Sequence, residues 1–417
     1  MLCQFSVKNY RSIKEEVTLD MQAAALSEHK DHLLTCKDGE NFLPVAVIYG
    51  PNGGGKTNVL RAINDILIKI TAPICAVCPH NKESNCKIAT KAVRINTFKF
   101  CEDSFSSPTE FEIFFRTNKS EYRYNIQLLN EEVVYESMNK RDIGKRKNSN
   151  LFVKDISAKN IFSMCDQFKE MRIPQISKDL PLLSYLAITY SENEIVKDIL
   201  EWTMYKMTFI NFAARLTEYS IYASMLKREK KQILEMLKCL DIDIENYKVL
   251  EIDDDILDIH TFHNVNEKIT ELDLFEEESH GTKKLFSVIP RVIKCLIDGS
   301  ALVVDELDAK LHTKLLRHII ELFTNKRTNP KKAQLIFTSH DLSTMDNSIF
   351  RRDEIWFAAK NTEQATSLYS LAEFKDKSTG KSVRNDANFN KQYWEGRYGA
   401  DPYLRKIIDW EVAPSEE

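Results

Sequence analysis

The sequence has no long apolar run, no strong excess of charge and little glycine. Of its 417 residues, 43% are hydrophobic and 29% charged, which is typical of a soluble globular protein with two or three domains, or one large α/β unit with an insertion. Apolar stretches are too short to span a membrane, and Met1–Phe5 lacks the basic and then apolar pattern of a leader. We therefore expect a cytoplasmic protein without a membrane partner. A net charge of −4 gives no general attraction to nucleic acid, which would need a local basic patch.

Nine cysteines are present, and in a reducing compartment they are more often free thiols or metal ligands than disulfides. Cys75, Cys78, His80 and Cys86 lie within twelve positions of one another. Cysteine thiolates and a histidine can complete a closed structural Zn²⁺ site, which is one prediction for this segment. The alternative is that Cys75 is a small apolar residue within the run Ile74–Val77.

Four of the 11 glycines fall in one octapeptide, Gly50–Thr57, which fits the phosphate-loop pattern at every required position. The preceding residues Val45–Tyr49 predict a buried strand, and apolar residues at helical spacing follow the loop. A strand, a glycine-rich turn and a helix start aim backbone N–H groups at one point, where phosphates can bind. Lys56 is expected to pair with the outer phosphates and Thr57 to ligate Mg²⁺. The loop residues predicted to bind nucleotide are Asn52, Gly53, Gly54, Gly55, Lys56, Thr57 and Asn58.

Two further predicted strands end in polar residues of the type that phosphate hydrolysis needs. Ala301–Val304 is followed by Asp305 and Glu306, which could hold Mg²⁺ and activate a water molecule, respectively. Leu335–Thr338 is followed closely by His340. Because carboxyl ends of parallel strands share one edge of a sheet, we expect Lys56, Glu306 and His340 to form a catalytic cluster there.

Two more sites are candidates for anion contacts. Ser279 and Gly281 stand at the start of an apolar-periodic helix, where backbone N–H groups are unpaired. Arg11 lies in a polar turn, Asn9–Ser12, upstream of the phosphate loop and could reach a nucleotide phosphate, although a lone arginine in a turn is usually a surface residue.

Three segments are expected. Residues 1–150 form a first lobe that carries the phosphate loop, the cysteine-rich insert 75–86 and, between Phe98 and Ser137, alternating apolar residues of an antiparallel sheet. Residues 151–248 are predicted to be a helical insertion, and 249–417 a second lobe. The basic loop 140–147 is either a solvated surface or a contact for a nucleic-acid backbone.

The chain also contains the motifs Phe5–Ser12, Glu278–Thr282, Asp305–His312, Arg351–Phe357 and Tyr393–Ala400. With the phosphate loop, they resemble ATPase heads of the ABC class, in the branch shared with chromosome-maintenance and RecF-like proteins. They are most similar to bacterial AAA15/AbiL-type ATPases of abortive-infection and anti-phage systems, to which the ATPase of the PARIS defence system and the Septu-type ATPases are related. The resemblance implies an α/β fold, an ABC-type P-loop head with two lobes, a mixed sheet plus an antiparallel subdomain, and a helical insertion.

The resemblance further implies a homo-oligomer with ATP held between two subunits. Lys56, Thr57, Asp305 and Glu306 would act from one subunit, and Ser279 with Gly281 from the other. Arg11 and Ser12 match the family's nucleotide-contacting turn. The expected function is an ATPase that senses infection, with a phage protein as trigger, and controls a separate effector, a nuclease. The alternatives are a RecF-like DNA repair or recombination ATPase, and an effector that cuts nucleic acid itself.

Overall fold

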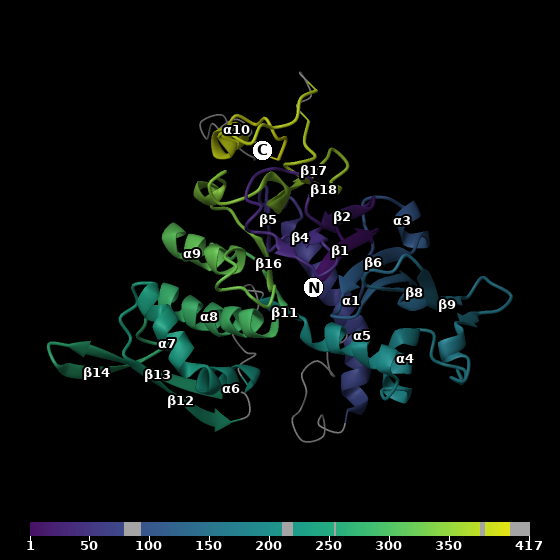
Figure 1. Ribbon diagram of the computed structural model, residues 1–417, viewed down its shortest axis with the longest axis horizontal. Coiled ribbons are helices and arrows are strands. Elements are labelled where there is room, and N and C mark those ends of the chain that lie inside the picture. The colour runs from purple at the N-terminus through teal and green to yellow at the C-terminus, as the bar shows by residue number, and fades with distance from the viewer. Residues whose placement is uncertain (79–92, 211–219, 254–255, 376–379, 401–417) are drawn as a thin grey trace, which may run out of the picture.

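A computed structural model describes residues 1–78, 93–210, 220–253, 256–375 and 380–400 (Figure 1). Its central sheet has the strand order β11-β15-β16-β5-β17-β18. The first five strands are parallel and β18 runs antiparallel at the edge. These strands are β5 (Val45–Tyr49), β11 (Met207–Ile210), β15 (Ala301–Val304), β16 (Gln334–Thr338), β17 (Ile355–Lys360) and β18 (Thr366–Ser370).

Strand β5 is buried on both faces, which is why its sequence is a continuous apolar run. Ala46 and Ile48 pack in one hydrophobic core with helix α1 (Lys56–Val77). Val47 and Tyr49 point the other way, into a second core with α9 (Thr313–Thr324). Helix α8 (His280–Asp298) contributes to that second core and to a third with α6 (Ser220–Arg228) and α7 (Lys230–Cys239). The sheet therefore carries helices on both faces.

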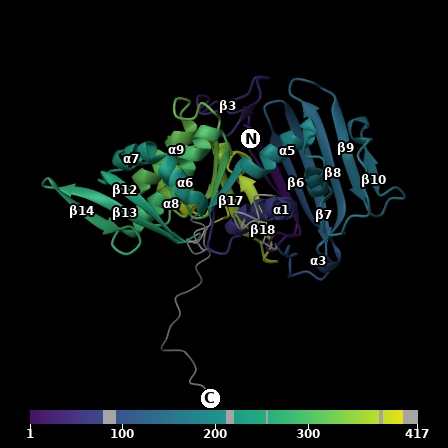
Figure 2. The same cartoon turned by 90° about the horizontal axis from the view of Figure 1, so that it is seen from below.

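A seven-stranded antiparallel sheet forms the other large layer, and Figure 2 shows it at the opposite side of the molecule from β12–β14. Its strand order is β10-β9-β8-β7-β6-β1-β2. Tyr122, Tyr124, Ile126 and Leu128 alternate with less buried neighbours along β7, as period-two patterning predicts. The strands are β1 (Leu2–Lys8), β2 (Val17–Asp20), β6 (Thr109–Arg116), β7 (Ser120–Leu129), β8 (Glu132–Asp142), β9 (Asn148–Asp155) and β10 (Phe162–Met164).

The segment predicted as a helical insertion, residues 151–248, is more varied than expected. It contains α4 (Leu182–Thr189), α5 (Glu194–Tyr205), α6 and α7. However, β9 and β10 extend the antiparallel sheet into it, and β11 pairs with β15 at the edge of the central sheet. These short strands were missed because the apolar residues of the neighbouring helices give the whole segment a helical spacing.

Smaller elements complete the described chain. A three-stranded sheet, β12 (Asn246–Asp253), β13 (Ile256–Val265) and β14 (Lys268–Asp273), projects beside α6 and α7 (Figure 1). The remaining elements are β3 (Leu34–Thr35), β4 (Asn41–Phe42), α3 (Asp103–Ser106), α10 (Phe389–Trp394) and three short 3₁₀ helices, η1 (Asp166–Phe168), η2 (Leu342–Thr344) and η3 (Arg352–Glu354).

The α/β class, mixed sheet, antiparallel subdomain and helical segment that we predicted are all present, which confirms the fold class. Within the described ranges, none of the helices has both the length and the apolar character required to cross a membrane.

Candidate nucleotide-binding site

The phosphate loop connects β5 to α1 and depends on glycine for its shape. Gly50, Gly53 and Gly55 have φ values of 145°, 75° and 104°, a backbone region that other residues rarely adopt. A Cβ atom on Gly50 or Gly54 would lie 2.1 or 2.6 Å from the carbonyl oxygen of Ala358 on β17. Strand β17 therefore packs directly against the loop, and Asn52 and Gly53 remain exposed at its tip.

A buried hydroxyl network fixes the other side of the loop. The Thr366 hydroxyl at the start of β18 donates to the carbonyl oxygen of Gly54 at 3.1 Å and lies 2.8 Å from the Ser12 hydroxyl. The Asn58 side-chain amide donates to Ser12 Oγ at 2.7 Å. Two predicted nucleotide residues, Ser12 and Asn58, are thus bonded to each other, and Thr366 joins them. Sequence reasoning missed Thr366 because it is more than 300 residues from the loop and belongs to no motif.

Lys56 is buried at the first position of α1. Its ammonium group donates to the carbonyl oxygens of Gly50 at 2.8 Å and Pro51 at 3.1 Å. Burial lowers the pKa of Lys56 to about 8, and the nearby Asp305, Glu306 and Asp308 oppose that effect. The Lys56 ammonium group therefore lies inside the phosphate loop, where it is predicted to pair with the outer phosphates of the nucleotide.

Asp305 lies within hydrogen-bond distance of Thr57 at the end of the phosphate loop. Strand β16 separates β15 from β5, so the loop, Asp305 and His340 all follow the carboxyl ends of neighbouring strands. The Thr57 hydroxyl donates to Asp305 Oδ1 at 3.2 Å, and the Thr338 hydroxyl donates to the same oxygen at 2.7 Å. A hydroxyl and a carboxylate at this spacing are hard oxygen ligands that suit Mg²⁺.

Glu306 occupies a backbone conformation that is unusual for a non-glycine residue, with φ of 52°. Its N–H donates to Thr338 Oγ1 at 2.7 Å and its carbonyl oxygen accepts from Lys284 Nζ at 2.8 Å, while its side chain is exposed. These backbone bonds hold the residue with its carboxylate toward solvent, where a water molecule can reach it.

His340 follows β16 and is exposed. Its backbone N–H donates to Asp308 Oδ2 at 3.0 Å. Partial burial, and then the charge of Lys56, lower the pKa of His340, while Asp308, Glu306 and Asp305 act in the opposite direction. The three predicted catalytic residues, Lys56, Glu306 and His340, are therefore electrostatic neighbours at one edge of the sheet. Asp308 belongs with them, and its position three residues after Asp305 was a signal that we did not use.

The predicted anion site at the start of α8 lies beside this cluster. Ser279 caps the helix by accepting from the N–H of Thr282 at 3.1 Å. A Cβ atom on Gly281 would lie 3.4 Å from the carbonyl oxygen of Lys310, an ordinary contact. Lys284, one turn further, donates to the carbonyl oxygens of Glu306 and Ala309. The N-terminal part of α8 therefore contacts the turn that carries Glu306, and Ser279 itself is exposed.

Arg11 is held by its neighbours near the start of the chain. Its Nε donates to the Tyr10 hydroxyl at 2.9 Å, and that hydroxyl donates to Asp65 Oδ2 on α1 at 2.6 Å. The guanidinium lies 3.8 Å from the same carboxylate and is partly exposed. To contact a phosphate, Arg11 would have to give up part of this arrangement.

The cysteine-rich insert is only partly described. Cys75 is buried in the last turns of α1, and Cys78 caps that helix and is half-buried. His80 and Cys86 lie outside the described residues. The Zn²⁺ site therefore stays a prediction.

The model of one protein family matches residues 45–346, a range that includes the phosphate loop, Asp305 and His340. Its description is "AAA domain, putative AbiEii toxin, Type IV TA system". The chain belongs to this AAA domain family. This AAA-family chain matches no curated protein.

Solved structures with a related arrangement share little sequence with this AAA-family chain. The SMC head domain from Thermotoga maritima has a TM-score of 0.41 and 12% identity, over 88% of this chain and 98% of that one. The SmcHead bound to the C-winged helix domain of ScpA gives 0.42 and 12%, over 88% and 97%. An Smc head domain with a coiled coil and joint from Pyrococcus yayanosii gives 0.37 and 10%, over 89% and 97%.

Proposed function

We propose that this AAA-family chain binds ATP with Mg²⁺ and hydrolyses the terminal phosphate. The observation that carries the proposal is the hydrogen bond between Thr57 on α1 and Asp305 after β15. It brings the two predicted Mg²⁺ ligands together from positions 248 residues apart. The fit of this pair to a hard cation, beside a buried lysine in a glycine-rich loop, is what ATP hydrolysis requires.

The residues of the site have distinct roles in this proposal. The Lys56 ammonium, now bonded to loop carbonyl oxygens, turns to the outer phosphates and neutralises their charge. Thr57 and Asp305 would hold Mg²⁺, which when bound would withdraw charge from the phosphates. The exposed Glu306 carboxylate accepts a proton from the water that attacks the γ-phosphorus, the bond to the bridging oxygen breaks so that ADP leaves, and His340 donates a hydrogen bond to the transferred phosphoryl group.

The proposal includes assembly of two or more copies around ATP. Ser279 and His280 at the start of α8 are solvent-exposed, and Lys284, one turn further along the helix, donates to the backbone carbonyl oxygen of Glu306. A second copy whose ATP binds at Ser279 and Gly281 would thus act close to the catalytic turn of the first. Assembly then depends on the nucleotide state, so hydrolysis acts as a switch.

At the level of the cell, we propose that this switch regulates abortive infection. The family description names a toxin system, and the sequence motifs resemble anti-phage ATPases. In this proposal a phage protein is the trigger and a separate effector, a nuclease, carries out the toxic step. The basic segment 140–147, which spans the end of β8 and the turn to β9, gives less support to a nucleic-acid partner, because Lys140 and Lys145 pair with Asp142 at 2.6 and 2.9 Å.

The test of the enzyme combines two variants of the full chain. Lys56→Ala should abolish ATP binding. Glu306→Gln should retain binding, lower kcat by roughly 10²–10⁴-fold and accumulate the ATP-bound oligomer, because it removes only the general base. Nucleotide affinity, phosphate release and mass by light scattering give the three readouts, with the exposed Glu321→Gln on α9 as control.

Normal turnover by Glu306→Gln would contradict the role given to Glu306.

The cellular role is tested separately, by plaque counts in cells that carry the gene with its neighbouring genes. Protection that is lost with Lys56→Ala supports the defence proposal. Hydrolysis stimulated by DNA, with a steep salt dependence and no effect on plaques, would overturn it in favour of a repair ATPase.

A further inference from the structure

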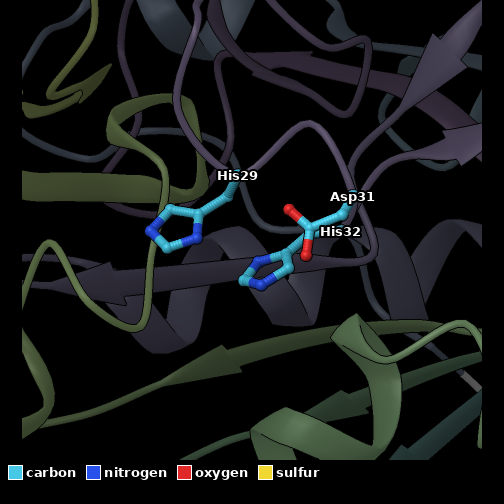
Figure 3. A group of neighbouring side chains, drawn as sticks. All are labelled: His29, Asp31 and His32. Carbon is cyan, nitrogen blue, oxygen red and sulfur yellow. The ribbon is translucent and has the colours of Figure 1, made fainter.

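A second group of ligand-type side chains lies away from the nucleotide site, in the segment between β2 and β3. His29, Asp31 and His32 each place one potential ligand atom within 4.8 Å of the others. Figure 3 shows the two imidazole rings side by side, with the Asp31 carboxylate next to the His32 ring. The rings are stacked, with centroids 4.5 Å apart and planes at 23°.

The first ring is oriented as a metal ligand would be. His29 Nε2 lies 2.7 Å from the backbone carbonyl oxygen of Asn347. Because a carbonyl oxygen only accepts hydrogen bonds, Nε2 carries the proton and Nδ1 keeps its lone pair. A backbone carbonyl on the far nitrogen is the usual partner of a metal-bound histidine, since it fixes the tautomer and the ring orientation.

The second ring, that of His32, has a nitrogen atom without a hydrogen-bond partner among the described residues. This atom, Nδ1, is buried. Leaving a buried polar atom unpaired costs about 1–3 kcal/mol, so a ligand that satisfies it is favoured.

Two arginines near the cluster are already paired. Glu28 accepts from Arg352 at 2.8 Å, and Asp353 accepts from Arg351 at 2.8 Å. These two guanidinium groups are therefore neutralised, and the Asp31 carboxylate is exposed and available to a cation.

We propose that His29, Asp31 and His32 bind one divalent transition-metal ion of the Zn²⁺ class, with water completing the coordination. Two imidazoles and one carboxylate suit such an ion better than Mg²⁺ or Ca²⁺, which prefer oxygen ligands. Tetrahedral ligation brings ligand atoms to roughly 3.3 Å of one another, so the exposed Asp31 and the half-buried His29 move inward on binding. The ion fixes the His29 ring against Asn347, and so ties this segment to the chain that follows His340.

The experiment uses the full chain, stripped with a chelator and then titrated with Zn²⁺ and with Co²⁺ as a spectroscopic probe. To separate this site from the cysteine-rich insert, the titration is repeated in a Cys78→Ser, Cys86→Ser background. We expect one equivalent of Zn²⁺ to remain bound in that background. Bound Co²⁺ should give visible d–d bands without the charge-transfer band of a thiolate ligand. The thermal midpoint should rise with the metal.

Matched variants decide the assignment. Asp31→Asn changes an exposed side chain, so the fold should persist, and it should weaken Zn²⁺ binding at least tenfold. His29→Ala should abolish both the binding and the thermal shift, whereas His318→Ala on α9 should change neither. Unchanged stoichiometry and affinity in Asp31→Asn and His29→Ala, or no equivalent bound in the Cys78→Ser, Cys86→Ser background, would overturn the proposal.

Discussion

Lys56 shows how burial sets the chemistry of a single residue. Its pKa is lowered to about 8, so the free protein loses this cation just above neutral pH. Phosphates bind the protonated form, and ATP binding must therefore be accompanied by proton uptake once the pH exceeds the pKa. We expect the affinity for ATP to fall by roughly tenfold per pH unit above about pH 8 and to be nearly flat from pH 6.5 to 7.5.

Calorimetric titration with ATP across this pH range measures the effect. Lys56→Met should bind weakly at all pH values with no such slope. Lys284 also has a pKa lowered to about 8 by burial, so Lys284→Met is the control that should keep the slope. A slope that persists in Lys56→Met would assign the titration to another group.

Among single residues, the sequence identified those candidate site residues that belong to short motifs. Lys56, Thr57 and Asp305 lie together because the strand ends that carry them are recognisable from apolar runs followed by polar residues. Thr366 and Lys284 could not be found in this way. Their importance comes from hydrogen bonds to backbone carbonyl oxygens of distant segments, and a threonine or lysine carries no signal of such a partner.

Between elements, Lys284 connects helix α8 to the turn after β15. Its buried ammonium donates to the carbonyl oxygens of Glu306 at 2.8 Å and Ala309 at 2.6 Å. Lys284→Met would remove both bonds and free Glu306 from a left-handed conformation that the fold imposes. We expect kcat to fall at least roughly tenfold and the Kd for ATP to change less than about threefold, because the phosphate loop is untouched.

Single-turnover hydrolysis and equilibrium ATP binding separate these two quantities. Lys283→Met is the matched control, since the Lys283 ammonium bonds to Phe275 on the other side of the helix start. Equal losses of kcat and of affinity in Lys284→Met would show that the bond supports the whole site rather than the catalytic turn.

Strands were predicted reliably where the alternation of apolar and polar residues ran over many positions. The prediction failed where a backbone N–H group donates to a side chain instead of to a neighbouring strand. The period-two run along β7 predicted a strand correctly. Phe98 and Phe100 gave the same signal but lie in irregular chain, because the N–H of Phe98 donates to the side chain of Asn9 at 3.1 Å instead of to a neighbouring strand. Alternation alone cannot show whether a partner strand is within reach.

For the whole molecule, Gln334 joins the two large sheets. It is 1% exposed at the start of β16, where its side chain accepts from Leu2 N–H at 2.8 Å and donates to the carbonyl oxygens of Leu2 at 3.0 Å and Leu43 at 3.2 Å. Gln334→Leu leaves three buried backbone groups without a partner. We expect a loss of about 3 kcal/mol or more in the free energy of unfolding.

Urea denaturation measures this loss, with Gln232→Leu on the exposed face of α7 as the control expected to change stability by less than about 0.5 kcal/mol. A loss below about 1 kcal/mol in Gln334→Leu would show that these bonds contribute little to holding the sheets together.

The central sheet has a further consequence for how the chain is synthesised. Strand β5 leaves the ribosome before its two neighbours, β16 and β17, which follow roughly 300 residues later. At a synthesis rate of about 5–20 residues per second, the apolar side chains and backbone groups of β5 stay without these partner strands for on the order of 15–60 s. The nascent chain therefore needs protection during that interval, and the phosphate loop can pack against β17 only after residues 355–360 have been made.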